Sequence, residues 1–369
     1  MQIDRRAFLA TSAVYGLAAT AAGAVKPTIR NKIAWYDVQK WGVEGKGWND
    51  TKRYFDRLPG RAESKVRGAV WGLSRHSAGM LFRFKTNSPV LHADYSLFSS
   101  RLAMPHMPAT GVSGLDVYAR DEKGTDRWLT VSFPRSQKMT MRLAGGIDSL
   151  PGKRPRTFTI YLPLYNGVET LQIGVQPGSV FEPIKPRKQK PIVFYGTSIM
   201  HGACASRAGL SISGILGRRL NRPVINLGFS GNGTMELSVG KFLAELDPAV
   251  YAIDCLPNMR GETVAKRTVP LVNQLRKARP KVPILLVEDR TYAYARFRRS
   301  ARKRHAQSRA ALRTAYKNLK AAGVKNLHYL SGASLLGSDG EATTDGSHPN
   351  DLGMVRYADA YEPILKKLL

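Results

Sequence analysis

The residues after position 191 alternate between short apolar runs and longer amphipathic segments, and this alternation limits the fold more than any other feature. Within 235–246 the apolar residues recur at helical spacing, and a last helical segment begins near Asn350 and Asp351, a typical N-cap. Strands interleaved with helices form a parallel sheet with helices on both faces. We expect residues 192–369 to be a three-layer α/β domain. Its strands would be Ile192–Tyr195, Val224–Leu227, Val250–Ile253, Ile284–Val287 and Leu327–Leu330.

The preceding residues, 28–181, show only short β-like runs separated by Gly, Pro, Asn and Asp. This spacing predicts an antiparallel β-sandwich. Residues 182–191 contain three prolines and four positive charges, which favours an interdomain linker. A length of 369 residues suits two such domains. The clearest β-like runs are Met80–Phe84, Leu91–Tyr95, Leu115–Tyr118, Trp128–Val131, Phe158–Leu162 and Leu171–Val175.

The first 27 residues are typical of an export signal. Arg5 and Arg6 precede a weakly apolar run rich in Ala and Gly, which ends at the cleavage-like Ala22-Gly23-Ala24. The paired arginines favour the twin-arginine route, and an uncleaved membrane anchor is the alternative. No later stretch approaches the ~18 apolar residues of a membrane helix. We expect a protein exported to the periplasm or the medium, without stable membrane insertion after cleavage of the signal.

The cysteine and histidine content limits disulfide, metal and cofactor chemistry. Two cysteines exclude a disulfide scaffold and a Cys-rich zinc site, although one bridge between Cys204 and Cys255 stays open. No phosphate-binding G-x-x-x-x-G-K-[ST] motif occurs. We therefore expect neither a metal nor a cofactor. Four histidines lack the paired spacing of zinc ligands: His76, His92, His305 and His328.

The formal net charge is +30, from 57 Lys and Arg against 27 Asp and Glu. Six of these cations fall in Arg296–Arg304. Export argues against nucleic acid as the partner. An acidic polysaccharide or an anionic envelope suits a solvated basic surface better, and a general alkaline bias without a specific partner remains the alternative.

Ser198 directly follows the first strand of the α/β domain, two residues after Gly196. In this architecture ligands bind beyond the carboxyl ends of the strands, so a serine at this strand-to-helix turn is placed as a nucleophile. The alternative is that Ser198 only caps the next helix. The G-x-S-x-G elbow is absent, because Met200 occupies the position of its last glycine.

Asp345 stands three residues before His348, on a turn bounded by Gly346 and Pro349. A carboxylate at this spacing can accept the ring N–H of the imidazole, which leaves the other nitrogen free to take a proton from Ser198.

Two further strand ends offer hydrogen-bond donors for an oxyanion that forms during the reaction. The backbone N–H of Gly231 and the carboxamide of Asn258 would join the N–H of Ser198, unless both residues serve only in turns.

In order and spacing, the blocks around Ser198, Gly231, Asn258 and Asp345 with His348 resemble the four blocks of the SGNH (GDSL-like) hydrolases. The resemblance covers about 191–369, with Gly-Thr-Ser in place of Gly-Asp-Ser and Pro-Asn-Met in place of Gly-x-Asn-Asp. It implies a flavodoxin-like sheet, a Ser198-His348-Asp345 triad and an oxyanion hole from Ser198, Gly231 and Asn258. No catalytic atom is lost, but the substrate of the subfamily is left in doubt.

The segment Gly114–Tyr118 resembles the G-x-D-L-Y signature of the β-rich domain that precedes some SGNH esterases, with Val117 in place of Leu. Met104–Gly111 and Leu164–Val168 resemble further pieces of that domain. Whether His106 reaches the active site or is a structural loop residue stays open.

Exported relatives with such a front domain often remove small acyl groups from sugars, so the resemblance implies a carbohydrate O-acetylesterase with an acylated carbohydrate as its substrate. A lipase or lysophospholipase of the same type is one alternative. A protein that binds acidic glycans, with incidental hydrolysis, is the other. The sequence does not determine the oligomeric state.

Overall fold

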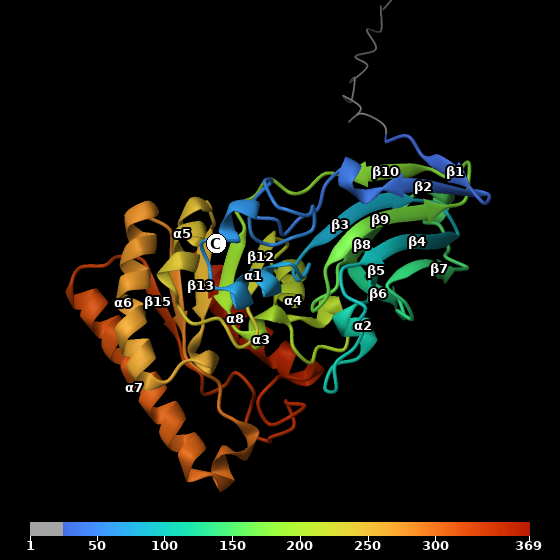
Figure 1. Cartoon of the computed structure of the whole chain (residues 1–369). Coiled ribbons are helices and arrows are strands. Elements are labelled where there is room, and N and C mark those ends of the chain that lie inside the picture. Colours follow the sequence, from blue (N-terminus) through green and yellow to red (C-terminus); the bar gives the residue numbers. More distant parts are fainter. Residues whose placement is uncertain (1–24) are drawn as a thin grey trace, which may run out of the picture.

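The computed structural model describes residues 25–369, and the predicted export signal therefore lies almost wholly outside the described residues. A front unit of antiparallel strands stands beside a rear unit whose parallel sheet is covered by helices (Figure 1). The predicted β-sandwich and three-layer α/β architecture are both confirmed. No helix in the described part of the chain is long and apolar enough to cross a membrane.

Two five-stranded sheets form the front unit, in the orders β1-β2-β9-β4-β7 and β10-β3-β8-β5-β6. Their facing sides enclose a core that includes Phe82, Phe84, Leu91, Phe158 and Ile173, all buried. The strands are β1 Thr28–Arg30, β2 Ile33–Asp37, β3 Leu81–Thr86, β4 Val90–Leu97, β5 Asp116–Arg120, β6 Asp126–Val131, β7 Lys138–Gly145, β8 Arg156–Tyr161, β9 Val168–Val175 and β10 Phe181–Ile184.

The segment expected as a linker, 182–191, begins inside a strand. Phe181–Ile184 is β10, which pairs with β3 so that Pro183 lies opposite Phe84. Proline is tolerated here because β10 is an edge strand, where a missing N–H leaves no bond of the sheet unmade. Only residues 185–191 connect β10 to the first strand of the rear unit.

All five strands of the rear sheet are parallel, in the order β12-β11-β13-β14-β15. Residues of β11 alternate between the two faces: Val193 and Tyr195 join one core, whereas Ile192 and Phe194 join the other. The strands are β11 Ile192–Gly196, β12 Val224–Gly228, β13 Val250–Asp254, β14 Ile284–Val287 and β15 Leu327–Leu330.

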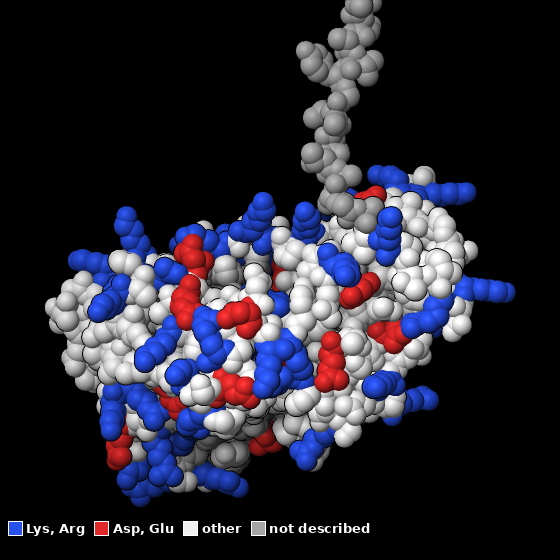
Figure 2. Space-filling view, turned by 45° about the horizontal axis from the view of Figure 1, so that its top comes forward, with Lys and Arg blue, Asp and Glu red and all other residues white. Residues whose placement is uncertain are grey.

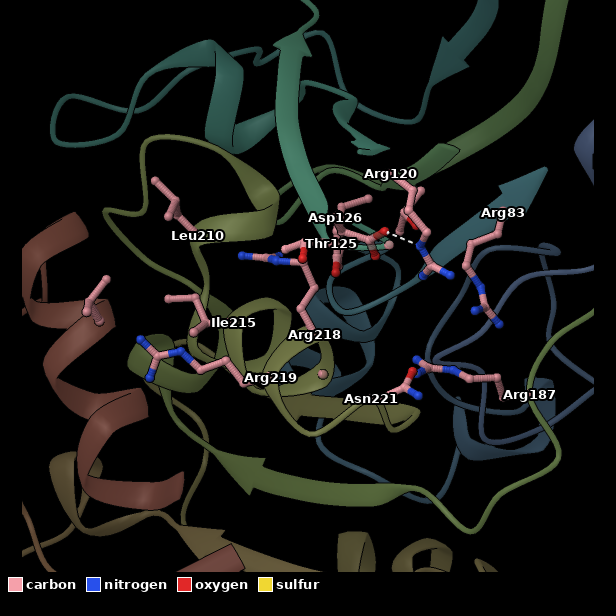
Figure 3. A pocket seen from close by; sticks show the side chains of 15 residues that line it. Arg83, Arg120, Thr125, Asp126, Arg187, Leu210, Ile215, Arg218, Arg219 and Asn221 are labelled. Carbon is pink, nitrogen blue, oxygen red and sulfur yellow. Dashed lines mark hydrogen bonds and ion pairs between the residues drawn. The ribbon is translucent and has the colours of Figure 1, made fainter. Parts of the chain in front are cut away.

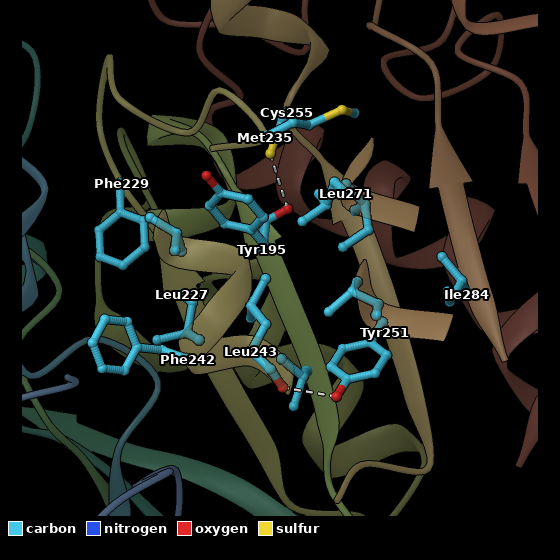
Figure 4. Close-up of a cluster of buried hydrophobic side chains, with 14 of the residues drawn as sticks. Tyr195, Leu227, Phe229, Met235, Phe242, Leu243, Tyr251, Cys255, Leu271 and Ile284 are labelled. Atoms are coloured by element: carbon cyan, nitrogen blue, oxygen red, sulfur yellow. Dashed lines mark hydrogen bonds between the residues drawn. The ribbon is translucent and has the colours of Figure 1, made fainter. Parts of the chain in front are cut away.

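Helices α5, α6 and α7 cover the first face of this sheet, and α4 and α8 cover the second. Figure 4 shows part of the first core, where Tyr195, Phe242 and Leu271 come from a strand and two helices. The predicted final helix is confirmed, with the side chain of Asn350 capping it at Gly353 N. The helices are α1 Gly68–Ser74, α2 Ala109–Val112, α3 Ser198–His201, α4 Ile212–Arg219, α5 Leu237–Glu245, α6 Gly261–Ala278, α7 Arg299–Ala321 and α8 Asp351–Leu368.

The two units share their cores. Trp48, Val70 and Trp71 precede β3 in sequence but pack against the first face of the parallel sheet. Tyr118 and Tyr161, from β5 and β8, join the core of the second face. The front unit is therefore fixed against the parallel sheet by buried apolar contacts as well as by the connecting segment.

Lys and Arg side chains are spread over the visible face of both units (Figure 2). They do not gather into one patch on that face, and acidic side chains lie among them. The run from Arg296 onwards ends a short 3₁₀ turn, Ala293–Phe297, and begins α7 at Arg299.

Candidate active site

Ser198 is the first residue of α3, at the carboxyl end of β11, the second strand of the parallel sheet. The helix is capped by Thr197, whose side chain accepts a hydrogen bond from Ile199 N at 3.3 Å. The capping role that the sequence left open for Ser198 thus belongs to its neighbour. Gly196 is required here, because a Cβ atom would lie 2.8 Å from Met200 Cβ. The Ser198 hydroxyl takes no part in the cap and contacts His348 instead.

A continuous chain of hydrogen bonds joins Ser198, His348 and Asp345. The Oγ of Ser198 lies 2.8 Å from Nε2 of His348, and Nδ1 of His348 lies 2.7 Å from Oδ2 of Asp345. Ser198 and His348 are thus 150 residues apart in sequence and in contact in space. This is the geometry in which a carboxylate holds the imidazole tautomer that can accept a proton from serine.

Asp345 also fixes the turn that carries His348. Its Oδ1 accepts from the backbone N–H of Ser347 at 2.9 Å and of His348 at 2.7 Å. Partial burial alone would raise the pKa of Asp345, but the bonds from His348 and Ser347 outweigh it and lower the pKa to about 2. The carboxylate of Asp345 is therefore ionised at neutral pH.

The turn is supported from behind by Arg290, which is 2% exposed. Its Nε donates to the carbonyl of Ser347 at 3.1 Å, and its guanidinium is ion-paired with Asp289. Gly346 has φ +82° and packs against the Tyr294 ring, 2.5 Å from where a Cβ would stand. These contacts hold the segment in one conformation although it belongs to a long loop after β15.

Gly231 and Asn258 flank Ser198 because β12 and β13 are the two neighbours of β11. Gly231 has φ +68° and open space where a side chain would stand. Its loop packs on the turn of the nucleophile, since Phe229 N donates to Gly196 O at 2.9 Å. Asn258 ends a short 3₁₀ turn, Leu256–Asn258, directly after β13. All three expected oxyanion donors thus follow the carboxyl ends of adjacent parallel strands.

The side chain of Asn258 is half-buried, and its Oδ1 has no hydrogen-bond partner among the described residues. The turn itself is held by Arg304, whose Nη2 donates to Pro257 O at 2.7 Å. The position of the Asn258 carboxamide is thus set by the backbone of the turn, and not by a hydrogen bond to its Oδ1 atom. It is free to donate through its nitrogen to a ligand.

The role of His106 stays open from sequence alone, and the structure places this front-unit residue beside His348. Its ring centroid lies 5.8 Å from that of His348. One potential metal-ligand atom from each of His106, Cys204 and His348 lies within 4.8 Å of the others. Sequence spacing could not find this group because its members come from three separate segments. Cys204 and Cys255 are both buried and form no disulfide, so the bridge that the sequence left open is absent, and burial raises the pKa of the Cys204 thiol to about 11.

A second buried group lies behind Ser198. The His201 ring stacks on Tyr165 at 4.1 Å, and its Nε2 lies 3.3 Å from both Arg57 and His76. Burial and then Arg57 lower the pKa of His76 to about 3, and both lower the pKa of His201 well below its usual value. The hydroxyl of Tyr165 donates to Ser198 O at 3.3 Å. His76 and His201 are therefore neutral, and with Tyr165 they support the turn that carries Ser198.

Family models match both units of the chain. The GDSL-like lipase/acylhydrolase family matches residues 189–366, and the GxDLY domain, the N-terminus of SGNH-hydrolase-type esterases, matches residues 33–181. A comparison with curated protein sequences finds no match.

Solved structures with both units are also similar. A Bacteroides ovatus protein assigned to the GDSL-like lipases is 31% identical, with a TM-score of 0.86, over 91% of this chain and 98% of its own. The salicylyl-acyltransferase SsfX3 of a tetracycline biosynthetic pathway is 16% identical, with a TM-score of 0.72, over 92% and 98%. The acetyl xylan esterase Est2A of Butyrivibrio proteoclasticus is 10% identical, with a TM-score of 0.55, over 91% and 98%. The last two share the fold. With its matched front and rear units and its likeness to the Bacteroides protein, the chain belongs to the GDSL-like lipase/acylhydrolase family of SGNH ester hydrolases, with a GxDLY domain at its front.

Proposed function

We propose that this protein is a serine esterase that removes small acyl groups, chiefly O-acetyl groups, from carbohydrates. The observation that carries the proposal is the hydrogen-bonded chain from Ser198 Oγ through His348 to Asp345. Such a chain supplies a nucleophile, a base and an orienting carboxylate without a metal or cofactor. The catalytic roles assigned to these residues are part of the proposal.

In the first half-reaction, Ser198 Oγ attacks the ester carbonyl carbon while its proton moves to Nε2 of His348. The carbonyl oxygen becomes negatively charged and accepts hydrogen bonds from the N–H of Ser198, the N–H of Gly231 and the carboxamide of Asn258. Collapse of this intermediate breaks the bond to the alcohol oxygen, which takes the proton from His348. The acyl group stays on Ser198.

Water completes the cycle. It attacks the acyl-serine carbonyl as His348 takes one of its protons, and the same donors bind the second oxyanion. Collapse releases the carboxylic acid, and His348 returns the proton to Ser198. Asp345 remains ionised throughout, because its hydrogen bonds hold its pKa at about 2.

The carbohydrate part of the proposal is supported by fold neighbours. Besides the acetyl xylan esterase, a family two carbohydrate esterase of Cellvibrio japonicus is 14% identical, with a TM-score of 0.53, over 79% of this chain and 89% of its own. These neighbours share the fold of this chain, and the carbohydrate substrate is proposed for it by analogy with them. His106 adds a polar group from the front unit beside His348.

Release of acetate from a panel of acetylated glycans tests the proposal. We expect acetate from at least one acetylated polysaccharide and, with nitrophenyl esters, kcat/KM highest for acetate and falling with acyl length. A preference for long acyl chains would instead assign a lipase or lysophospholipase. Binding of an acidic glycan without turnover would assign a binding protein.

Export by the twin-arginine route is a separate proposal that rests on Arg5 and Arg6. We expect a reporter fused to residues 1–27 to leave the cytoplasm. Replacement of both arginines by lysine should retain it inside, because the pair itself is recognised. Export of the lysine variant would contradict the assigned route.

A further inference from the structure

A cavity of about 780 Å³ lies between the two units and has no part in the proposed chemistry. Arg83 and Arg120 enter it from the front sheet, and Arg218 and Arg219 enter it from α4. Arg187, in the connection between the units, completes the group (Figure 3). Five arginines therefore line this one cavity.

The cavity lies at the end of the parallel sheet opposite to Ser198. Arg187 precedes β11 and Asn221 precedes β12, so both stand at the amino ends of strands. Ser198 follows the carboxyl end of β11. A strand of this length separates the two ends by about 16 Å, at roughly 3.3 Å per residue. A ligand in the cavity would therefore not touch the nucleophile.

Two of the arginines share one carboxylate. Glu44, which is 5% exposed, accepts from Nη2 of Arg187 at 2.7 Å and is also ion-paired with Arg83. A single negative charge thus stands against two guanidinium groups. By contrast, Arg120 is matched by Asp126 at 2.9 Å, the ion pair drawn in Figure 3. The Glu44 group therefore leaves one positive charge unbalanced.

Arg218 supplies a second unbalanced charge. Its guanidinium carbon lies 4.1 Å from the centroid of the Tyr118 ring, and its Nη1 donates to Gly214 O at 3.1 Å. Within residues 25–369 it forms no ion pair with a carboxylate, whereas the adjacent Arg219 reaches Asp359 at 2.6 Å. An arginine held on aromatic rings keeps its donors and its charge available to a ligand.

We infer that this cavity binds a ligand that carries two negative charges on oxyanion groups, such as carboxylate, sulfate or phosphate, and so matches the excess positive charge at Arg187 and Arg218. The guanidinium fork favours oxyanions through paired N–H···O bonds. The volume lies within the usual range for small-molecule sites. Thr159, Tyr161 and Asn221 add polar groups to the lining, which suits a hydroxylated ligand such as an acidic sugar.

The inference does not depend on the esterase proposal, because binding is measured directly. Calorimetric titration of the full-length chain with inorganic sulfate and with digalacturonate should show one site. Cellobiose, an uncharged disaccharide, should not bind there. Tighter binding of digalacturonate would identify an acidic glycan as the source of the oxyanions. Equal or tighter binding of sulfate would identify a free inorganic anion.

Single-charge variants separate this site from the general positive charge of the protein. Arg187→Gln leaves Glu44 paired with Arg83, so folding should be preserved. This variant and Arg218→Gln should each weaken binding about tenfold, or about 1.4 kcal/mol. The matched control is Arg299→Gln, which removes one exposed charge at the start of α7 and should change the affinity less than twofold.

Equal loss of anion affinity in all three variants would overturn the inference, because binding would then depend only on the net charge of the protein. Binding of cellobiose as tight as that of digalacturonate would also overturn it, because binding would then not depend on the negative charge of the ligand. Absence of binding for both anions would overturn it as well. Ester hydrolysis by Arg187→Gln should stay within twofold of wild type. Failure of the anion-binding inference and failure of the esterase proposal can therefore be distinguished, because anion binding and ester hydrolysis are measured independently.

Discussion

Asp116 Oδ2 accepts a hydrogen bond from Nη1 of Arg207 at 2.9 Å, and this ion pair joins the two units beside the nucleophile segment. Asp116 is the acidic residue of the front-domain signature, and Arg207 follows Ser198 by nine residues (207 − 198). The same carboxylate accepts from Gly209 N at 2.7 Å and from Trp128 Nε1 at 3.0 Å. The signature therefore acts at the domain interface.

Replacement of Asp116 by Asn should lower the free energy of unfolding by about 1–3 kcal/mol, because it leaves Arg207 in a half-buried site without its counter-charge. Denaturant unfolding measures the change. Asp121→Asn is the matched control, since Asp121 pairs with Arg127 at the surface of the same unit and should change stability by less than ~0.5 kcal/mol. Equal losses in both variants would contradict a locking role for Asp116.

Asn258→Ala should reduce kcat by about 10²–10³, the usual effect of removing one oxyanion donor, with little change in KM. Thermal unfolding should be nearly unchanged, since the Asn258 Oδ1 atom has no partner among the described residues. Steady-state kinetics and a melting curve on the same preparation check both points. A variant with wild-type kcat would remove Asn258 from the oxyanion hole.

His106→Ala should impair acetylated glycans more than nitrophenyl acetate. His106 lies beside His348, which must protonate a sugar alcohol as it leaves, whereas nitrophenolate leaves without a proton. We expect kcat/KM to fall about tenfold for the glycan and less than threefold for nitrophenyl acetate. The small ester serves as the internal control. Equal losses on the two substrates would indicate a structural role for His106.

Asp254→Asn should stabilise the protein increasingly as the pH rises. Burial raises the pKa of Asp254 to about 7, against ~3.9 in the unfolded chain, although Tyr361 donates a bond to it at 2.7 Å. Folding therefore favours the protonated acid, and the wild type loses this stability as the pH rises from about 4 to 7. The difference between variant and wild type should grow by up to about 1.4 kcal/mol per pH unit in that window and level off above it. A difference independent of pH would contradict the shift.

Much of the rear unit could be predicted because its strands are short apolar runs and its chemistry follows their ends. Ser198 stands at a strand end that sequence alone identifies. Its partners Asp345 and His348 lie three residues apart, and this spacing already allows the bond between them. The distance between Ser198 and His348 could not be predicted, because the long loop after β15 sets it through contacts such as that of Arg290 with Ser347.

The front unit was less predictable. Met139, Met141 and Leu143 of β7 alternate with polar residues, a period-two signal that could have identified this strand. The strand β10 could not be recognised, because an edge strand tolerates Pro183 and its charged neighbours, and in sequence such residues are typical of a linker. The approach of His106 to His348 depends on how the two units pack, and no local pattern in either segment encodes that.

Turnover of an acetyl ester by Ser198→Ala, compared with wild type, tests whether Ser198 is the nucleophile. In the proposed mechanism, the Ser198 hydroxyl is the group that forms a bond to the acyl carbon before water does. We predict that kcat/KM falls by at least ~1000-fold while the melting temperature stays close to that of wild type. A Ser198→Ala protein that is folded and still hydrolyses the ester at a comparable rate would contradict the assignment.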